Sequence, residues 1–382
     1  MEKIVVFGAP SGGVFGLRQL RKQWPKSIIY VIAPKSDIGY YSNCYNEFIV
    51  VNNSRELINA SEIAYKKLGG GNIYAFIYSN LMLEYILLED NKSLFNLFIF
   101  ENSIEVYDVI VDKTKVDKLC RQLGLSRPLE YDLAKEEQLD KIKYPIVIKP
   151  LEKQKAKGAS KCMFIYDRLA LDKYLQEIKS YNISIDNLVC QQAVRGLNKW
   201  EYGYGGYFKN GRPIVDICFH QFRQSPQGLS CYIREITNLS LQHSLRSLVQ
   251  PFLNNLHYNG FIEFDIKQDE ITKELFVLDI NPRPWGSADI LNVKLGESSV
   301  YEPKLTKYNA VWRRLSSELF SHRNINNISY KECKMITGKK EFRTVHALYD
   351  KNDLNVFYYH FKIWIIQILK KQLFRLKSIL NH

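Results

Sequence analysis

Residues 260–287 read GFIEFDIKQDEITKELFVLDINPRPWGS and contain the clearest structural pattern in the chain. Two apolar runs flank a short polar connector, which predicts a β-hairpin. A simple hairpin register places Glu263 opposite Asp279, and facing residues on paired strands have Cβ atoms about 5 Å apart. Asp279 and Asn281 are two residues apart, so they share one face of their strand. The hairpin is therefore expected to gather two carboxylates and an amide.

These three side chains have the chemistry of a magnesium site. Two carboxylates at facing positions repel each other unless a cation lies between them. Carboxylate and amide oxygens suit Mg²⁺, which usually also takes phosphate oxygens and water, and Mn²⁺ is an alternative ion. A charged hairpin that simply faces water is the other interpretation. The hairpin by itself leaves both open.

Lysines upstream of the hairpin favour the metal site. Lys149 ends the apolar strand pattern YPIVIKP, where an ammonium on the buried side needs an anionic partner. Lys113 follows DVIVD, which we interpret as a second apolar strand. Gly158 and Ser160 belong to the basic stretch KQKAKGASK, whose backbone N–H groups are suited to phosphate. Each lysine alone is more often merely solvated, so the set carries more weight than any member.

The rest of the chain predicts a mixed α/β protein. KIVVFGA, SIIYVIA and AFIYS are strand patterns separated by helical segments, which is how a parallel α/β layer begins. The stretch GAPSGGVFG does not match GxGxxG, so we expect a tight turn there. Farther on, KTKVDKLCRQLGLSRP predicts a helix, and NLVCQQAVRG and EYGYGGYFKNGRPIVDICFHQF add strands to an antiparallel sheet with the hairpin. From Leu354 the chain has one long aromatic and basic helical pattern.

Composition limits the class of protein. The chain has 382 residues, of which 46% are hydrophobic and 24% charged, and this excludes collagen-like and disordered proteins. Its net charge is +13, but residues 302–382, with 16 Lys or Arg and six Asp or Glu, carry +10 of it. A basic tail argues against a nucleic-acid surface spread over the fold. Seven scattered cysteines without a CxxC motif predict reduced thiols and a cytoplasmic protein.

Taken in order, these features resemble the ATP-grasp superfamily, in particular its carboxylate–amine-ligase branch, which is like the large subunit of carbamoyl-phosphate synthase. The resemblance covers about residues 1–300. It rests on DKTKVDKLCRQLGLSRP, YPIVIKP and VCQQAVRG, and above all on IEFDI and LFVLDINPRPWGS. It implies α/β and α+β classes: a Rossmann-like pre-ATP-grasp domain at 1–112, an ATP-grasp domain at 113–300 with a lid at about 125–190, and a C-terminal helical extension at 301–382.

The resemblance implies roles for individual residues at the metal and phosphate positions. Glu263, Asp279 and Asn281 would bind Mg²⁺, although the family more often has Glu at the position of Asp279. Arg283 would act as a catalytic residue that steadies the phosphates or an acylphosphate. Lys149 would share that catalytic role while it contacts ATP.

Other positions match the family's nucleotide contacts. The resemblance implies that Lys113 contacts the ATP phosphates and that the loop with Gly158 and Ser160 closes over them. Gln191, Gln192 and Val194 would lie against adenine, but an acidic residue is more common at the position of Gln192. Two further residues are candidates by their position, Glu201 for the ribose and Arg223 for an anion, and for each a solvated side chain is the alternative.

The implied function is an ATP- and Mg²⁺-dependent ligase that activates a substrate carboxylate as an acylphosphate and joins it to an amine or a thiol. One alternative is an ATP-grasp kinase of small molecules, and another is a membrane-docked nucleotide-binding protein without turnover. The expected partners are a small carboxylate and an amine, and no nucleic acid. The tail helix has two open roles: peripheral contact with the inner face of a membrane, or packing on the enzyme or on another subunit in a homodimer.

Overall fold

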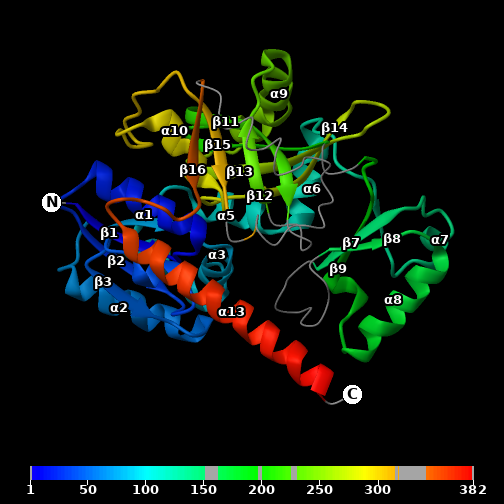
Figure 1. Ribbon diagram of the computed structural model, residues 1–382, viewed down its shortest axis with the longest axis horizontal. Helices are drawn as coiled ribbons and strands as arrows, with labels where there is room; N and C mark the ends of the chain where they lie inside the picture. Colours follow the sequence, from blue (N-terminus) through cyan, green and yellow to red (C-terminus); the bar gives the residue numbers. More distant parts are fainter. Residues whose placement is uncertain are drawn as a thin grey trace. The chain divides into compact units, whose positions relative to one another are not determined.

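The computed structural model describes residues 2–150, 162–196, 200–224, 230–314, 317 and 341–380 (Figure 1). The chain divides into two compact units. The first consists of Met1–Asp112, Leu197–Asp265 and Asp279–His382, and the second consists of Lys113–Gly196 and Ile266–Leu278.

The first unit begins with a five-stranded parallel sheet, as the sequence predicted. The strand order is β3 (Glu47–Val50), β2 (Ile28–Ala33), β1 (Lys3–Phe7), β4 (Tyr74–Ile77), β5 (Ile99–Phe100). The connecting segments hold η1 (Ile38–Tyr41) and the helices α1 (Ser11–Gln23), α2 (Leu57–Lys67), α3 (Asn80–Ile86) and α4 (Leu94–Leu97). The central strand β1 is buried on both faces, which explains its continuous apolar run.

The glycine-rich stretch after β1 lies mostly in a helix, so the predicted turn is limited to its first residues. Gly8 has a φ of +85°, and α1 begins three residues later at Ser11. A Cβ on Gly12 would lie 2.2 Å from the carbonyl oxygen of Pro284. Glycine therefore lets the start of α1 approach the backbone that directly follows Arg283.

The prediction of a strand at DVIVD is wrong, because this segment forms the end of helix α5 (Ile104–Val111). Tyr107 and Ile110 are buried and Asp108 is exposed, which is the spacing of a helix with one buried face. A short run of β-branched residues does not distinguish a strand from a helix segment. Lys113 is consequently the first residue of helix α6 (Lys113–Gln122) rather than a residue at a strand end.

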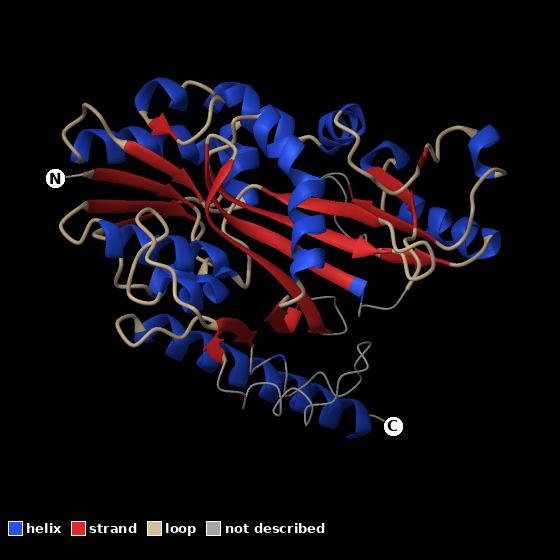
Figure 2. Cartoon of the chain, turned by 90° about the horizontal axis from the view of Figure 1, so that it is seen from above, coloured by secondary structure: helices blue, strands red, loops and turns tan. Residues whose placement is uncertain are grey.

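A seven-stranded sheet contains the predicted hairpin (Figure 2). Its order is β14 (Leu275–Asn281), β13 (Gly260–Gln268), β10 (Glu201–Lys209), β11 (Arg212–Gln224), β12 (Ser230–Glu235), β15 (Asn309–Arg313), β16 (Phe342–His346). Asn210 and Gly211 both have positive φ in the two-residue turn between β10 and β11, as a type I′ hairpin requires. The sequence did not predict β15 and β16, which add two strands within residues 301–382.

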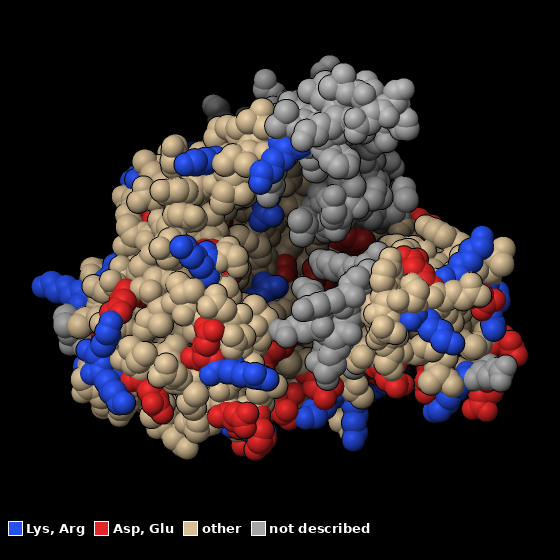
Figure 3. Space-filling view, turned by 90° about the horizontal axis from the view of Figure 1, so that it is seen from below, with Lys and Arg blue, Asp and Glu red and all other residues tan. Residues whose placement is uncertain are grey.

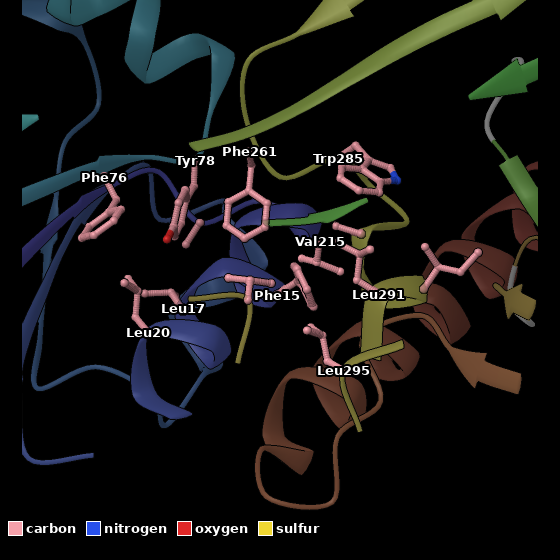
Figure 4. Packing of buried hydrophobic residues seen from close by; sticks show 14 of the residues in the cluster. Phe15, Leu17, Leu20, Phe76, Tyr78, Val215, Phe261, Trp285, Leu291 and Leu295 are labelled. Atoms are coloured by element: carbon pink, nitrogen blue, oxygen red, sulfur yellow. The ribbon is translucent and has the colours of Figure 1, made fainter. Parts of the chain in front are cut away.

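Aromatic side chains join α1 and the parallel sheet to the seven-stranded sheet (Figure 4). The Phe261 ring on β13 lies 5.8 Å from the Phe15 ring on α1 and 6.0 Å from the Tyr78 ring, both edge to face. Trp285 stacks on Phe219 of β11 with ring centroids 6.2 Å apart. This core fixes the chain on both sides of residues 279–283. Helices α9 (Leu239–Asn255) and α10 (Leu291–Leu295) complete this part of the unit.

The second unit has its own four-stranded sheet. The order is β6 (Glu130–Tyr131), β9 (Leu188–Gln192), β7 (Ile146–Pro150), β8 (Met163–Ile165), and all pairs are antiparallel. Helix α8 (Arg168–Ser180) packs on one face of it through a core that includes Ile146, Ile148 and Leu171, and a short helix α7 (Glu136–Leu139) precedes β7. The expectation that NLVCQQAVRG joins the hairpin's sheet is wrong, since β9 belongs here.

The predicted C-terminal helix is present as α13 (Leu354–Leu380) in the first unit. Within the described residues, every helix is too short or too polar to cross a bilayer. Lys and Arg side chains are interspersed with Asp and Glu side chains over the surface that Figure 3 shows. The six described cysteines are free thiols, in agreement with the expectation.

Candidate functional site

The hairpin of β13 and β14 brings the predicted metal ligands together in the first unit. Glu263 and Asn281 are each 8% exposed, and the Asn281 Nδ2 donates to the Glu263 Oε2 over 3.3 Å. Asp279 is exposed and lies two residues before Asn281 on the same face of β14. Its charge acts on Glu263, because it raises the pKa of that carboxyl. The site thus has one buried carboxylate and one that faces water.

A third carboxylate, Asp265, belongs to this cluster and was missed by the sequence analysis. Burial raises the pKa of Glu263 well above its usual range, Asp265 and Asp279 raise it further, and Arg283 opposes them. Asp265 accepts a hydrogen bond from the Gln221 Nε2 over 3.3 Å. The alternation of β13 was the available signal, since residues 263 and 265 share one face of a strand.

Arg283 supplies the positive charge of the site and is held by Asn80. Its Nε donates to the Asn80 Oδ1 over 2.8 Å, and its Nη2 donates to the Asn281 Oδ1 over 3.2 Å. Burial lowers the pKa of the guanidinium, and the neighbouring carboxylates, Glu263 first among them, oppose this effect. Asn80 begins α3 at the carboxyl end of β4, 203 residues before Arg283. No pattern in the sequence connects these two residues.

The donor chemistry of this cluster fits a hard divalent cation. A buried carboxylate such as Glu263 is costly without compensating charge, and oxygen donors are the ligands that Mg²⁺ prefers. Among the described residues, no group of three or more His, Cys, Asp or Glu side chains is arranged to hold a metal ion. The candidate ligands stay those expected from the hairpin pattern: Glu263, Asp279 and the amide oxygen of Asn281.

The second unit brings two lysines to the end of β7. The Lys113 Nζ at the start of α6 donates to the carbonyl oxygen of Pro150 over 2.8 Å, directly after Lys149. The side chain of Lys149 is half-buried, and its ammonium has no hydrogen-bond or ion-pair partner among the described residues. Both lysines thus lie near the end of β7, which Lys113 reaches from a helix. Both cations are placed where an anion would be stabilised.

The face of β7 and β9 that carries Lys149 is separate from the core of the second unit. Lys149 pairs with Val189 and Val147 pairs with Gln191, so these four residues share one face. Gln192 pairs with Ile146 and belongs to the opposite face. The two glutamines assigned to adenine by resemblance are thus divided between the two sides of the sheet.

Gln191 is held on this face by an acidic neighbour. Its Nε2 donates to the Glu130 Oε1 on β6 over 2.7 Å. A hollow of about 350 Å³ opens nearby, and its lining includes Thr114, Glu130 and Val189. Val194 is half-buried and follows β9. Of the residues in this region, the resemblance assigns Gln191 and Val194 to the nucleotide.

Two further candidates lie on β10 and β11 of the first unit. Glu201 accepts a hydrogen bond from the Gln224 Nε2 over 2.6 Å, and Gln224 also donates to the Gln221 Oε1 over 2.8 Å. Through Gln221, this network continues to Asp265. Arg223 is 3% exposed, and the register between β11 and β12 shifts on both sides of it. Gly158 and Ser160 lie outside the described residues.

Comparison with known proteins gives the fold. No family model matches the chain. A carbamoyl-phosphate synthase from Methanobrevibacter smithii is 21% identical over 203 residues, which are 50% of this chain and 50% of that protein. The chain therefore matches about half the length of this curated relative.

Solved structures cover more of the chain. N5-carboxyaminoimidazole synthetase from Staphylococcus aureus matches with a TM-score of 0.61 and 14% identity over 81% of each chain. A β,γ-ATP complex of biotin carboxylase from Campylobacter jejuni gives 0.60 and 12% over 81% of this chain and 75% of that one. An L-amino acid ligase from Bacillus licheniformis gives 0.56 and 11% over 78% and 71%. The chain has the ATP-grasp fold, as its sequence predicted.

Proposed function

We propose that this protein is an ATP- and Mg²⁺-dependent ligase that activates a substrate carboxylate as an acylphosphate and joins it to an amine. The observation that carries the proposal is the cluster on β13 and β14, where buried Glu263 and Asn281 adjoin Arg283. This cluster pairs oxygen donors for a cation with a guanidinium for phosphate. The similarity to a synthetase, a carboxylase and a ligase supports this reaction class over others available to the fold.

Glu263, Asp279 and Asn281 would hold the metal ion. A bound Mg²⁺ offsets the negative charge of the phosphates during transfer. The role of the chain is to place one buried and one exposed carboxylate beside an amide, so that a cation is favoured at this position. Mn²⁺ is accepted by the same donors.

Arg283 would stabilise the negative charge that develops when the carboxylate attacks phosphorus. Its hydrogen bond to Asn80 fixes the guanidinium before the reaction begins, and a group that is already oriented stabilises a transition state without further reorganisation. Such a mechanism is electrostatic and needs no enzyme nucleophile.

The second unit would bind the nucleotide. Lys149 and Lys113, whose ammonium is held at the end of β7, would contact the phosphates. Gly158 and Ser160 would belong to a loop that closes over the phosphates. The remaining proposed nucleotide and anion contacts are Gln191, Gln192 and Val194 at the adenine, Glu201 at the ribose and Arg223 at an anionic group.

Asp265 would suit an amine as the second substrate. It adds a carboxylate next to the proposed metal ligands, and an ammonium group is attracted to such a position before it loses a proton and attacks. A kinase would use such a carboxylate to accept the proton of a substrate hydroxyl, so the requirement for an amine in the assay separates the two reactions. The kinase remains the second candidate, and a nucleotide-binding protein without turnover is the third.

The proposal also covers where the enzyme is located in the cell and how it assembles. We place the enzyme in the cytoplasm, with α13 in peripheral contact with a membrane and a homodimer as the alternative role of that helix. The domain boundaries at residues 112 and 300, with a lid at 125–190, stay as proposed from the sequence.

The test is a screen of ADP release. Purified protein with Mg·ATP is incubated with pools of amino acids, uronic acids and small dicarboxylates, with and without pools of amines. We expect ADP release that requires one carboxylate and rises with one amine, together with an amide product in the mass spectrum. A stable phosphorylated product that forms without any amine would support the kinase instead.

A further inference from the structure

Helix α13 has an apolar stripe that the chain leaves exposed. Its residues are Leu354, Tyr358, Phe361, Ile365 and Leu369, and each is between 39% and 61% exposed. At about 100° per residue these five positions fall within a sector of about 80°. The stripe is therefore one continuous face, and large apolar side chains gathered on one face are characteristic of an interaction surface.

The other side of α13 is attached to the first unit in the first turns of the helix, whereas Ile363 and Ile366, farther along and away from the stripe, are 40% and 41% exposed. Val356 is fully buried against Val14 and Leu348. The Tyr359 ring stacks on the Tyr41 ring of η1 with centroids 3.8 Å apart. The stripe faces away from these contacts, because Leu354 and Ile365 are about 160° and 180° around the helix from Val356. Figure 1 shows α13 in red, near the end of the chain.

A buried ion pair fixes the start of the helix. The Arg18 Nε donates to the Asp353 Oδ2 over 3.0 Å, and the exposed fractions of the two side chains are 4% and 1%. The Ser42 hydroxyl also donates to the Asp353 Oδ2, over 2.8 Å. The residue directly before α13 is therefore held by two segments of the first unit, which orients the helix that follows.

The charge of this segment is of one sign. Residues 354–382 contain five Lys or Arg and no Asp or Glu. Lys362 and Lys370 are exposed; Lys362 lies about 60° and Lys370 about 140° around the helix from Ile365. An apolar stripe with a cation beside it, on a segment without acidic side chains, is complementary to a surface that offers hydrocarbon below a layer of negative charge.

We infer that α13 binds the surface of an anionic lipid bilayer, with its axis parallel to the surface and the stripe inserted. This property is independent of the ligase chemistry. A second copy of α13 fits less well, because two such helices would bring ten cationic and no acidic side chains together. A coiled coil whose core begins at Tyr358 would also contain Gln372 and Arg375 in that core after two heptads. Two apolar heptads are fewer than a stable coiled coil needs.

The experiment is sedimentation of the full chain with vesicles. Vesicles of phosphatidylcholine with phosphatidylglycerol are compared with vesicles of phosphatidylcholine alone, at low and at high salt. We expect binding to the anionic vesicles that high salt reverses. Replacement of Lys362 by alanine should lower the partition coefficient about fivefold.

Two matched variants locate the surface on the helix. Ile365→Asp places a carboxylate in the stripe, and Ile363→Asp makes the same change about 160° around the helix at a site of similar exposure. We expect about tenfold or greater loss of binding for Ile365→Asp and much less for Ile363→Asp. ADP release and thermal unfolding of both variants should match those of the unmodified protein.

Three results would overturn the inference. The full chain could remain in the supernatant with anionic vesicles at low salt. The two aspartate variants could bind equally well. Analytical ultracentrifugation could find a dimer that Ile365→Asp dissociates, in which case the stripe is an interface between copies of the chain. Each of these results leaves the ADP-release test of the ligase unaffected.

Discussion

Replacing Asn80 tests how the structure positions Arg283. The Asn80 Oδ1 accepts the 2.8 Å hydrogen bond from the Arg283 Nε, and its Nδ2 lies 3.5 Å from the Asn281 Oδ1. A hydrogen bond to a charged group contributes about 1.5–3 kcal/mol. If that energy is realised in the transition state, Asn80→Ala should lower the rate of ADP release by about 10- to 100-fold. Asn80→Asp keeps an acceptor for the guanidinium and should restore part of the rate.

The control is Asn91, a buried asparagine of the same parallel-sheet region. Its Nδ2 donates to the carbonyl oxygens of Ser54 and Tyr85, so Asn91→Ala should lower thermal stability without changing the rate per folded molecule. Steady-state ADP release and calorimetric unfolding are measured for each variant. A normal rate in Asn80→Ala, or equal effects of both alanine variants on rate and stability, would refute the role of Asn80 as a positioning residue.

Three further predictions concern the metal, the phosphates and Glu101, an acid that accepts a hydrogen bond from Tyr207. Asp279→Asn should lower Mg²⁺-dependent ADP release by about 10²-fold or more with unchanged unfolding, and turnover like that of the unmodified protein would remove Asp279 from the metal site. Lys149→Met should weaken ATP binding measured by calorimetry, whereas Lys143→Met, at an exposed site, should not. Equal ATP affinities of the two variants would mean that the Lys149 ammonium is only solvated. Burial raises the pKa of Glu101 to about 7, so the folded state holds this proton more tightly than the unfolded state and stability should fall as pH rises from 5 to 7. Denaturant titrations should find that Glu101→Gln flattens this dependence, and identical slopes would contradict it.

The fold could be predicted where a local pattern matches tertiary burial. The β13–β14 hairpin, the parallel strands and α13 have such patterns, and all are present. The strand prediction for DVIVD was wrong because three apolar residues in a row fit the buried side of α5 as well as a strand. The strands β15 and β16 were missed because their pairing with β12 and with each other depends on contacts distant in sequence.

The candidate site divides in the same way. Glu263, Asn281 and Arg283 could be predicted to lie together because one hairpin and the residues after it contain all three. Asp265 could have been predicted to join them, because it shares a face of its strand with Glu263. Asn80 was not, because its contact with Arg283 exists only once α3 is placed against the end of β14. The opposite faces of residues 191 and 192 also follow from alternation, because the two are consecutive in β9, whereas the pairing with β7 decides which of them shares a face with Lys149.

The most direct test of the proposed reaction follows an oxygen atom. The carboxylate found in the screen is labelled with ¹⁸O on both oxygens and turned over with Mg·ATP and its amine. If the carboxylate attacks phosphorus and the amine then displaces phosphate, one ¹⁸O leaves with the inorganic phosphate and one stays in the amide. Mass spectrometry should therefore find singly labelled phosphate in equal amount to the amide product. Unlabelled phosphate would contradict activation of the carboxylate as an acylphosphate.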